Sequence, residues 1–116
     1  MRDELVQWQW AHYPEGHTTR LNLMVHAVTV PMFQGGFLIL LATPILGWVG
    51  LFGLLAVVTA ILAQGRGHGL EPTKPIPFQG PIDVVSRLFV EQWITFPRFM
   101  LSGGFVRAWM RAGRSA

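Results

Sequence analysis

The chain contains few side chains that can do metal or acid–base chemistry. It has four histidines and no cysteine, so thiolate metal sites, disulfides and cysteine nucleophiles are excluded. His17 and His26 lie near the start of a long apolar stretch, and His68 follows its end. Neutral imidazoles, with or without a carboxylate, suit a borderline first-row metal such as Fe(II) or Zn(II). These residue types predict a metal site if the fold brings the two ends of the apolar stretch together.

The spacing of the first two histidines restricts how they can meet. Asn22 and His26 are four residues apart, so they share one face of a helix. His26 lies about one turn inside the apolar stretch, where an imidazole needs a partner. His17 precedes His26 by about two and a half helical turns, so in one continuous helix the two rings would point to opposite faces. Both can bind one ion only if His17 lies on a turn at residues 14–16 and folds back.

Each of these residues also has a structural interpretation, and the sequence leaves both open. His26 can serve as a hydrogen-bonded helix-packing residue, and His68 as a loop histidine. Glu71, shortly after His68, is either a catalytic carboxylate or a solvated acid. His12 follows an aromatic segment, which favours an interfacial position over a ligand role. The functional interpretation depends on the convergence of the histidines on one face of the molecule.

The composition indicates that much of the chain meets lipid. Hydrophobic residues make up 51% of the 116 residues and charged residues only 13%, roughly half the ~25% of an average soluble domain. No charged residue lies between Arg20 and Arg66, and a single domain of this size cannot bury such a run. From Arg98 onward there are arginines and no acid, a tail that favours anionic lipid head groups over nucleic acid. These features exclude an ordinary soluble globule, a disordered chain and a free nucleic-acid-binding protein.

The uncharged run has the length of two membrane crossings. One crossing needs about 20 residues, so we expect spans at about 22–42 and 46–63, joined by a turn at 43–45 that contains a proline. Two crossings return the chain to the membrane face that it left, which brings His68 back to His17 and His26. The lysine and arginine bias predicts that this face and both termini are cytoplasmic.

The flanking segments are expected to lie on the membrane surface. Residues 2–13 predict a short helix, and after a proline-rich stretch further interfacial helices are expected at about 82–96 and 105–112. A third crossing over 84–106 stays open, although it would carry Arg87, Glu91 and Arg98 into lipid. The expected fold is therefore all-α: a single domain, 1–116, built as an integral membrane hairpin of two transmembrane helices with flanking interfacial helices.

The order of the polar residues forms a motif that covers about residues 8–103. It reads Tyr13-x3-His17-x4-Asn22-x3-His26-x4-Pro31, an apolar hairpin, and Gly67-His68-x2-Glu71 with Pro75; a later run has Pro77-Phe78-x-Gly80-Pro81, Arg87, Glu91-Gln92 and Phe96-Pro97-Arg98-Phe99. The combination resembles the Mpo-type family of 2-hydroxy fatty acid dioxygenases of fatty acid alpha-oxidation. The later run is similar to a branch of small bacterial members.

The resemblance implies a multi-pass membrane oxidoreductase that uses Fe(II) and O2. In a bacterium such a protein is expected in the inner membrane. The implied reaction shortens a 2-hydroxy fatty acid by one carbon and releases the carboxyl carbon as CO2. The implied iron ligands and catalytic residues are His17, His26 and His68. Asn22 and Glu71 match polar positions of the motif, Glu71 as a further catalytic residue and Asn22 as one that orients the ligands. Tyr13 matches a position near the cofactor without a defined role.

The sequence departs from the family at two places. Thr29 stands where many members have glycine, and the run 72–75 reads Pro-Thr-Lys-Pro where many have an Asn-Arg-Pro-like run. These departures leave the substrate open, and zinc remains an alternative to iron. The alternatives in function are a non-enzymatic membrane accessory or lipid-binding protein, whose histidines serve packing, and a zinc-dependent lipid hydrolase. The sequence does not specify acyl length, stereochemistry or oligomeric state.

Overall fold

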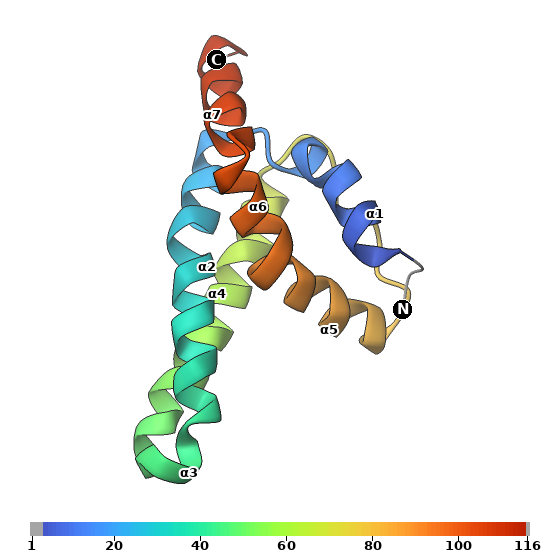
Figure 1. Ribbon diagram of the computed structural model, residues 1–116. Helices are drawn as coiled ribbons and strands as arrows, with labels where there is room; N and C mark the ends of the chain where they lie inside the picture. The colour runs from blue at the N-terminus through green and yellow to red at the C-terminus, as the bar shows by residue number, and fades with distance from the viewer. Residues whose placement is uncertain (1–3, 116) are drawn as a thin grey trace.

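The computed structural model describes residues 4–115, and every regular element in that range is helical (Figure 1). Two long helices, α2 (Arg20–Leu41) and α4 (Gly50–Gly69), form an antiparallel hairpin. A short helix, α3 (Thr43–Leu46), and a 3-10 turn, η2 (Gly47–Val49), close its tip. Both α2 and the stretch Thr43–Gly69 are long and apolar enough to cross a membrane. The prediction of an all-helical chain with two long apolar helices is confirmed.

The second long helix ends later than the apolar pattern predicted. The expected span stopped at 63, whereas α4 continues to Gly69, so that His68 lies in its last turn and not in a loop. Gln64 and Arg66 are good helix formers, and the glycines between Gln64 and Leu70 weaken the helix without ending it. The first residue that breaks the helix is Pro72. The histidine is therefore held by a regular helix.

Small residues let the two hairpin helices approach closely. A Cβ atom added to Gly36 would lie 2.7 Å from the Ala56 Cβ and 2.9 Å from the Gly53 carbonyl oxygen. Only glycine fits at such a crossing, as in tightly packed membrane helices. The small residues of α4 thus allow close packing against α2 of the same chain.

The remaining helices cover the half of the hairpin that is remote from its tip (Figure 1). A continuous helical segment runs through α5 (Pro81–Val90), the π-helical turn η3 (Glu91–Thr95) and α6 (Phe96–Leu101), which contains and extends the helix expected at 82–96. α7 (Gly104–Ser115) packs on α2, while α1 (Leu5–His12), followed by the turn η1 (Tyr13–Gly16), packs on α5 and η3. The helix expected at 105–112 corresponds to α7.

The centre of this arrangement is unusually polar. Apolar residues such as Leu23, Val30 and Phe99 are buried there. The buried polar residues are Gln9, His17, Asn22, His26, Thr29, Gln64, Glu71, Asp83, Glu91, Gln92 and Thr95. Buried polar side chains need partners and are the informative exception to apolar burial. Their contacts define the candidate site.

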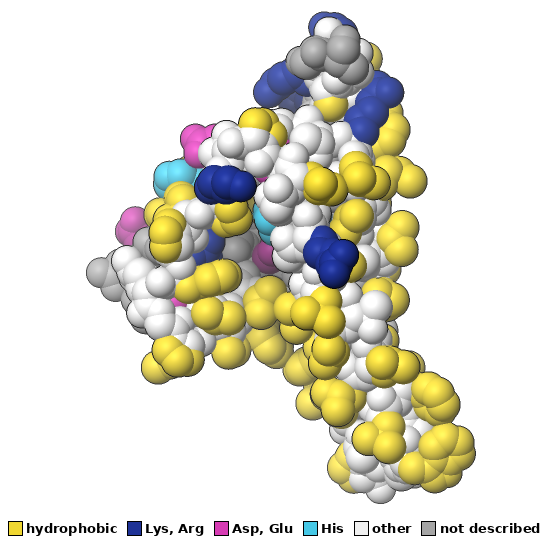
Figure 2. Space-filling model, turned by 180° about the vertical axis from the view of Figure 1, so that it is seen from behind, with side chains coloured by type: hydrophobic (Ala, Val, Ile, Leu, Met, Phe, Trp, Pro, Cys, Tyr) yellow, Lys and Arg dark blue, Asp and Glu magenta, His cyan; other side chains and the backbone are white. Residues whose placement is uncertain are grey.

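The outside of the hairpin is apolar instead (Figure 2). Hydrophobic side chains cover its projecting end, while lysine and arginine side chains lie away from the tip. The most exposed of the large apolar residues on the lower hairpin include Leu41, Ile45, Trp48, Leu51, Phe52 and Leu55. A continuous apolar surface of this kind marks an interaction with another apolar phase or partner.

Candidate metal centre

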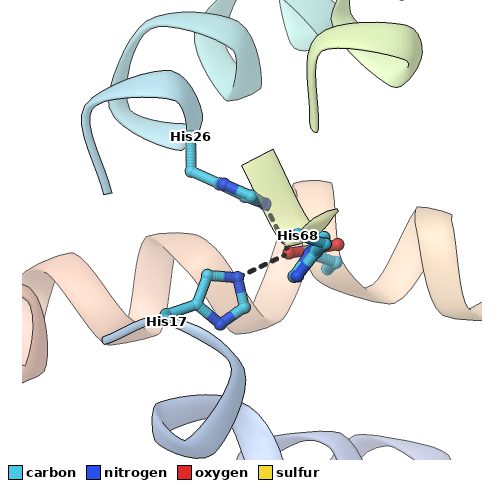
Figure 3. Close-up of side chains that lie close together, drawn as sticks. His17, His26 and His68 are labelled. Atoms are coloured by element: carbon cyan, nitrogen blue, oxygen red, sulfur yellow. Dashed lines mark ion pairs between the residues drawn. The ribbon is translucent and has the colours of Figure 1, made fainter. Parts of the chain in front are cut away.

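Three elements bring three histidines to one point (Figure 3). His17 follows η1, His26 lies in the second turn of α2, and His68 lies in the last turn of α4. Their ring centroids are 4.7 Å apart for His17 and His26, 4.8 Å for His17 and His68, and 5.0 Å for His26 and His68. The turn before His17 folds back, as the spacing required, and the hairpin returns His68 to the same end.

Glu91, the first residue of η3, completes the group. One ligand atom from each of His17, His26, His68 and Glu91 lies within 4.8 Å of all the others. The Glu91 Oε2 atom lies 3.5 Å from His17 Nε2 and 3.3 Å from His26 Nε2. With metal–ligand bonds of about 2.0–2.1 Å, the ligands of a tetrahedral ion are about 3.3–3.4 Å apart. These two separations fit one shared ion.

The hydrogen bonds of the buried imidazoles leave one nitrogen of each facing this point. His17 Nδ1 lies 2.7 Å from the Tyr13 carbonyl oxygen, and His26 Nδ1 lies 3.0 Å from the Asn22 carbonyl oxygen. A carbonyl can only accept, so each Nδ1 carries a proton and donates. Within residues 4–115, neither Nε2 atom has a hydrogen-bond partner, although both are buried. A metal ion would satisfy both nitrogens, with the carbonyls fixing the ring orientation.

Glu91 is held as an anion in this environment. Burial alone would raise the pKa of Glu91, but its interactions with His17 and His26 outweigh burial and lower that pKa well below its usual value. A divalent ion bound between the carboxylate and the imidazoles would balance this charge, since such ions bind ionised carboxylates and neutral imidazoles. The donor set of neutral imidazoles and one carboxylate therefore fits Fe(II) or Zn(II).

Tyr13 contacts both the carboxylate and one imidazole. Its hydroxyl donates to Glu91 Oε2 at 2.8 Å, and its ring stacks on His17 with centroids 3.9 Å apart. Burial, together with the neighbouring Glu91 charge, raises the pKa of Tyr13 well above its usual value. Tyr13 therefore stays protonated and orients the carboxylate.

Glu71, expected as a catalytic residue, lies outside the four-residue group and caps the start of α2. Its Oε1 accepts from the Thr18 N–H at 2.9 Å and the Thr18 hydroxyl at 2.6 Å. Its Oε2 accepts from the Thr19 N–H at 3.1 Å, the Thr19 hydroxyl at 3.0 Å and Asn22 Nδ2 at 2.9 Å. A carboxylate at a helix N-terminus satisfies free N–H groups and interacts favourably with the helix dipole. Its contacts join the chain after α4 to the segment that holds His17 and His26.

Asn22, expected as a residue that orients ligands, is fully buried next to these contacts. It donates to the Gly16 carbonyl oxygen at 3.1 Å as well as to Glu71, and its own carbonyl holds His26. Its Oδ1 atom lies where a Cβ atom on Gly67 would be. Asn22 thus links α2, the η1 turn and α4, and it requires glycine at position 67.

His12 is not part of the group. Its Nδ1 lies 2.8 Å from the Trp8 carbonyl oxygen, and its ring packs on Trp8 with centroids 5.0 Å apart. The ligand role that the sequence left open for His12 receives no support from this geometry.

The sequence did not identify Glu91 as a member of the site, because it appeared there as a charge that opposed a third crossing and as one residue of the later motif run, without a role. An acid within an apolar helix was the signal that could have found it.

The site is open mainly on the side of His68 and Glu91. The side chains of His17 and His26 are 4% and 0% exposed, against 12% for Glu91, and His68 is partly exposed. Figure 2 shows a histidine and an acidic side chain at the bottom of a depression beside the hairpin. A separate cavity of about 270 Å³ lies against His17, between η1 and α7.

Comparison of the chain with protein-family models, curated proteins and solved structures gives no match. The motif is therefore the only basis for the expected family, and the geometry of the four-residue group is the basis for a metal site.

Proposed function

We propose that the chain is a metal-dependent membrane enzyme, an Fe(II) dioxygenase that shortens 2-hydroxy fatty acids by one carbon. The observation that carries this proposal is the meeting of His17, His26, His68 and Glu91. Within residues 4–115, the buried Nε2 atoms of His17 and His26 make no hydrogen bond and face the Glu91 carboxylate at 3.5 and 3.3 Å. Histidines that served only packing would use those nitrogens in hydrogen bonds, because an unsatisfied buried polar atom costs about 1–3 kcal/mol. The resemblance of the motif to the dioxygenase family supplies the reaction.

The proposed reaction balances without a further reductant. A 2-hydroxy acid, RCH(OH)COOH, and O2 give RCOOH, CO2 and H2O, so the acid loses four electrons and O2 gains them. His17, His26, His68 and Glu91 would hold Fe(II), which would supply the one-electron chemistry that a direct reaction of O2 with the acid lacks. Tyr13 and Glu91 keep a proton and a negative charge at fixed places beside the reacting groups. His17 and His26 are buried and His68 is partly exposed, so substrate approaches from the side of His68 and Glu91.

Lipid is the proposed environment of the hairpin. Apolar side chains cover its surface and its tip, and the four-residue group lies at the end remote from the tip. The substrate's head group would meet polar residues there, while its alkyl tail follows the hairpin, each buried CH2 contributing about 0.8 kcal/mol. Arg20 and Arg66 at this end favour a cytoplasmic position for it and for both termini, in a bacterial inner membrane.

Metal analysis of the detergent-purified protein tests the proposal. We expect stoichiometric iron, O2 consumption with 2-hydroxypalmitate, and a product one carbon shorter. His17→Ala, His26→Ala and His68→Ala should each lose the metal, while His12→Ala, a matched change outside the group, should retain it. Zinc with no O2 requirement would indicate a hydrolase instead. Absence of any metal, with histidine substitutions that affect only stability, would indicate an accessory or lipid-binding protein.

A further inference from the structure

The helix that carries Glu91 changes its hydrogen-bond pattern at that residue. In η3 the Phe96 N–H bonds to the Glu91 carbonyl oxygen, five residues earlier, instead of four. The next bond of the same kind would join residue 97 to the Gln92 carbonyl, but Pro97 has no N–H. Such π-turns are rare and occur frequently at functional sites. The turn thus leaves the Gln92 carbonyl in need of another donor.

A glutamine on α2 supplies that donor. Gln34 Nε2 donates to the Gln92 carbonyl oxygen at 2.7 Å. Gln34 is half-buried on α2. Its amide takes the place of the missing backbone donor, so it stabilises the π-turn against a return to regular α-helix.

Two more glutamines hold the same turn from the other neighbouring helices. From α4, Gln64 exchanges two side-chain hydrogen bonds with Gln92, at 3.1 and 2.7 Å. From α1, Gln9 donates to the Arg87 carbonyl at 3.0 Å and accepts from the Thr95 hydroxyl. The helices α1, α2 and α4 therefore each contribute one glutamine. These glutamines lie outside the four-residue metal-binding group.

The fixed turn determines where Glu91 points. Glu91, Gln92 and Thr95 are the buried residues of η3. Gln92 directly follows Glu91 and is fixed through both its side chain and its carbonyl, so the backbone at Glu91 has little freedom to rotate. In a regular α-helix each bond of this segment would reach four residues back instead of five, and the side chains that now face inward would rotate about the helix axis. The carboxylate would then leave the position between His17 and His26.

We propose that Gln9, Gln34 and Gln64, acting through Gln92 and the π-turn, are positioning residues that hold Glu91 as a metal ligand. This inference rests on the proposed metal site and adds the contacts that hold its fourth ligand, Glu91, in place. Outer residues that orient ligands typically change metal affinity by 10–100-fold. The glutamines should therefore act on metal affinity only through Glu91.

Co(II) is the probe for this coupling, because its visible spectrum reports the ligand set and its affinity can be titrated. Gln34→Met keeps the length of the side chain and removes the donor, and Gln7→Met makes the same change at an exposed residue. We expect Gln34→Met to lower Co(II) affinity about 10-fold and to shift the spectrum toward that of Glu91→Gln. Gln7→Met should match the wild type. The double variant Gln34→Met/Glu91→Gln should bind no more weakly than Glu91→Gln alone.

A second variant reaches the turn from the other side. Pro97→Ala restores an N–H that can donate to the Gln92 carbonyl oxygen within the π-turn, so this carbonyl no longer depends on Gln34, and the variant should keep the wild-type spectrum. In that background Gln34→Met should have no further effect. An additive loss in Gln34→Met/Glu91→Gln, an undiminished effect of Gln34→Met in the Pro97→Ala background, or a wild-type spectrum in Gln34→Met would overturn the inference while leaving the metal site intact. A wild-type protein that binds no Co(II) would overturn the proposed function first.

Discussion

Replacement of Glu71 by glutamine separates a helix-capping role from a role as metal ligand. The Glu71 carboxylate accepts two hydrogen bonds at Oε1 and three at Oε2, from Thr18, Thr19 and Asn22. An amide NH2 in place of Oε1 would face the Thr18 N–H and leave that donor without an acceptor. Because hydrogen bonds to charged groups contribute about 1.5–3 kcal/mol, we expect Glu71→Gln to lower the free energy of unfolding by about 2–3 kcal/mol. At about 4 °C per kcal/mol for a chain of this size, the Tm should fall by about 10 °C.

The same variant predicts a specific pH dependence. Burial alone would raise the pKa of Glu71, but the hydrogen bonds from Thr18, Asn22 and Thr19 outweigh it and lower that pKa. A group with a lowered folded pKa contributes stability above its unfolded pKa and loses it as the pH falls through the folded pKa. The difference in Tm between wild type and Glu71→Gln should have its full size at neutral pH and should disappear at acid pH.

Thermal unfolding in detergent, followed by tryptophan fluorescence between neutral and acid pH, measures both effects. Glu15→Gln is the matched control, because Glu15 is an exposed acid in η1 and should leave the Tm unchanged. Metal content at low temperature completes the assay. A Glu71→Gln protein with wild-type Tm and no bound metal would refute the capping argument and return Glu71 to the ligand set.

Three further predictions concern Tyr13, Gly67 and the bound metal. Tyr13→Phe removes the hydrogen bond to Glu91 and should weaken metal binding about 10-fold while keeping the metal stoichiometry, as a Co(II) titration would show; unchanged affinity would contradict the orienting role. Gly67→Ala places a Cβ atom on Asn22 Oδ1, whereas a Cβ atom at Gly65 meets no described atom within 4 Å. The first change should lower the Tm. The second should raise it slightly, because alanine is more favourable than glycine in a helix by up to about 1 kcal/mol. Equal shifts in Tm would contradict the packing argument. A chelator should lower the Tm of the metal-loaded protein, since a ligand at 100 times its Kd stabilises by about 2.7 kcal/mol, and should not affect His26→Ala.

The hairpin was predictable because it depends on composition alone. An uncharged run long enough for two helices has to fold back in a chain of this length, and the return brings His68 to His17 and His26. The detailed ends of the helices were less predictable, since α4 continues through polar residues until Pro72. The position of Glu91 could not be predicted from spacing. It depends on a π-turn, and that turn depends on contacts between Gln92 and residues of two other helices.

The histidines show why convergence identifies the site and local geometry does not. His12, His17 and His26 each place Nδ1 against the carbonyl oxygen four residues earlier, so this bond is a general property of histidine at these turns. What distinguishes His17 and His26 is the other nitrogen, which is buried, faces Glu91 and makes no hydrogen bond within the described residues. His12 is partly exposed and lies outside the group. A metal site therefore needs the local bond to fix the ring and the tertiary fold to bring the free nitrogens together, and only the second condition separates a ligand from a packing residue.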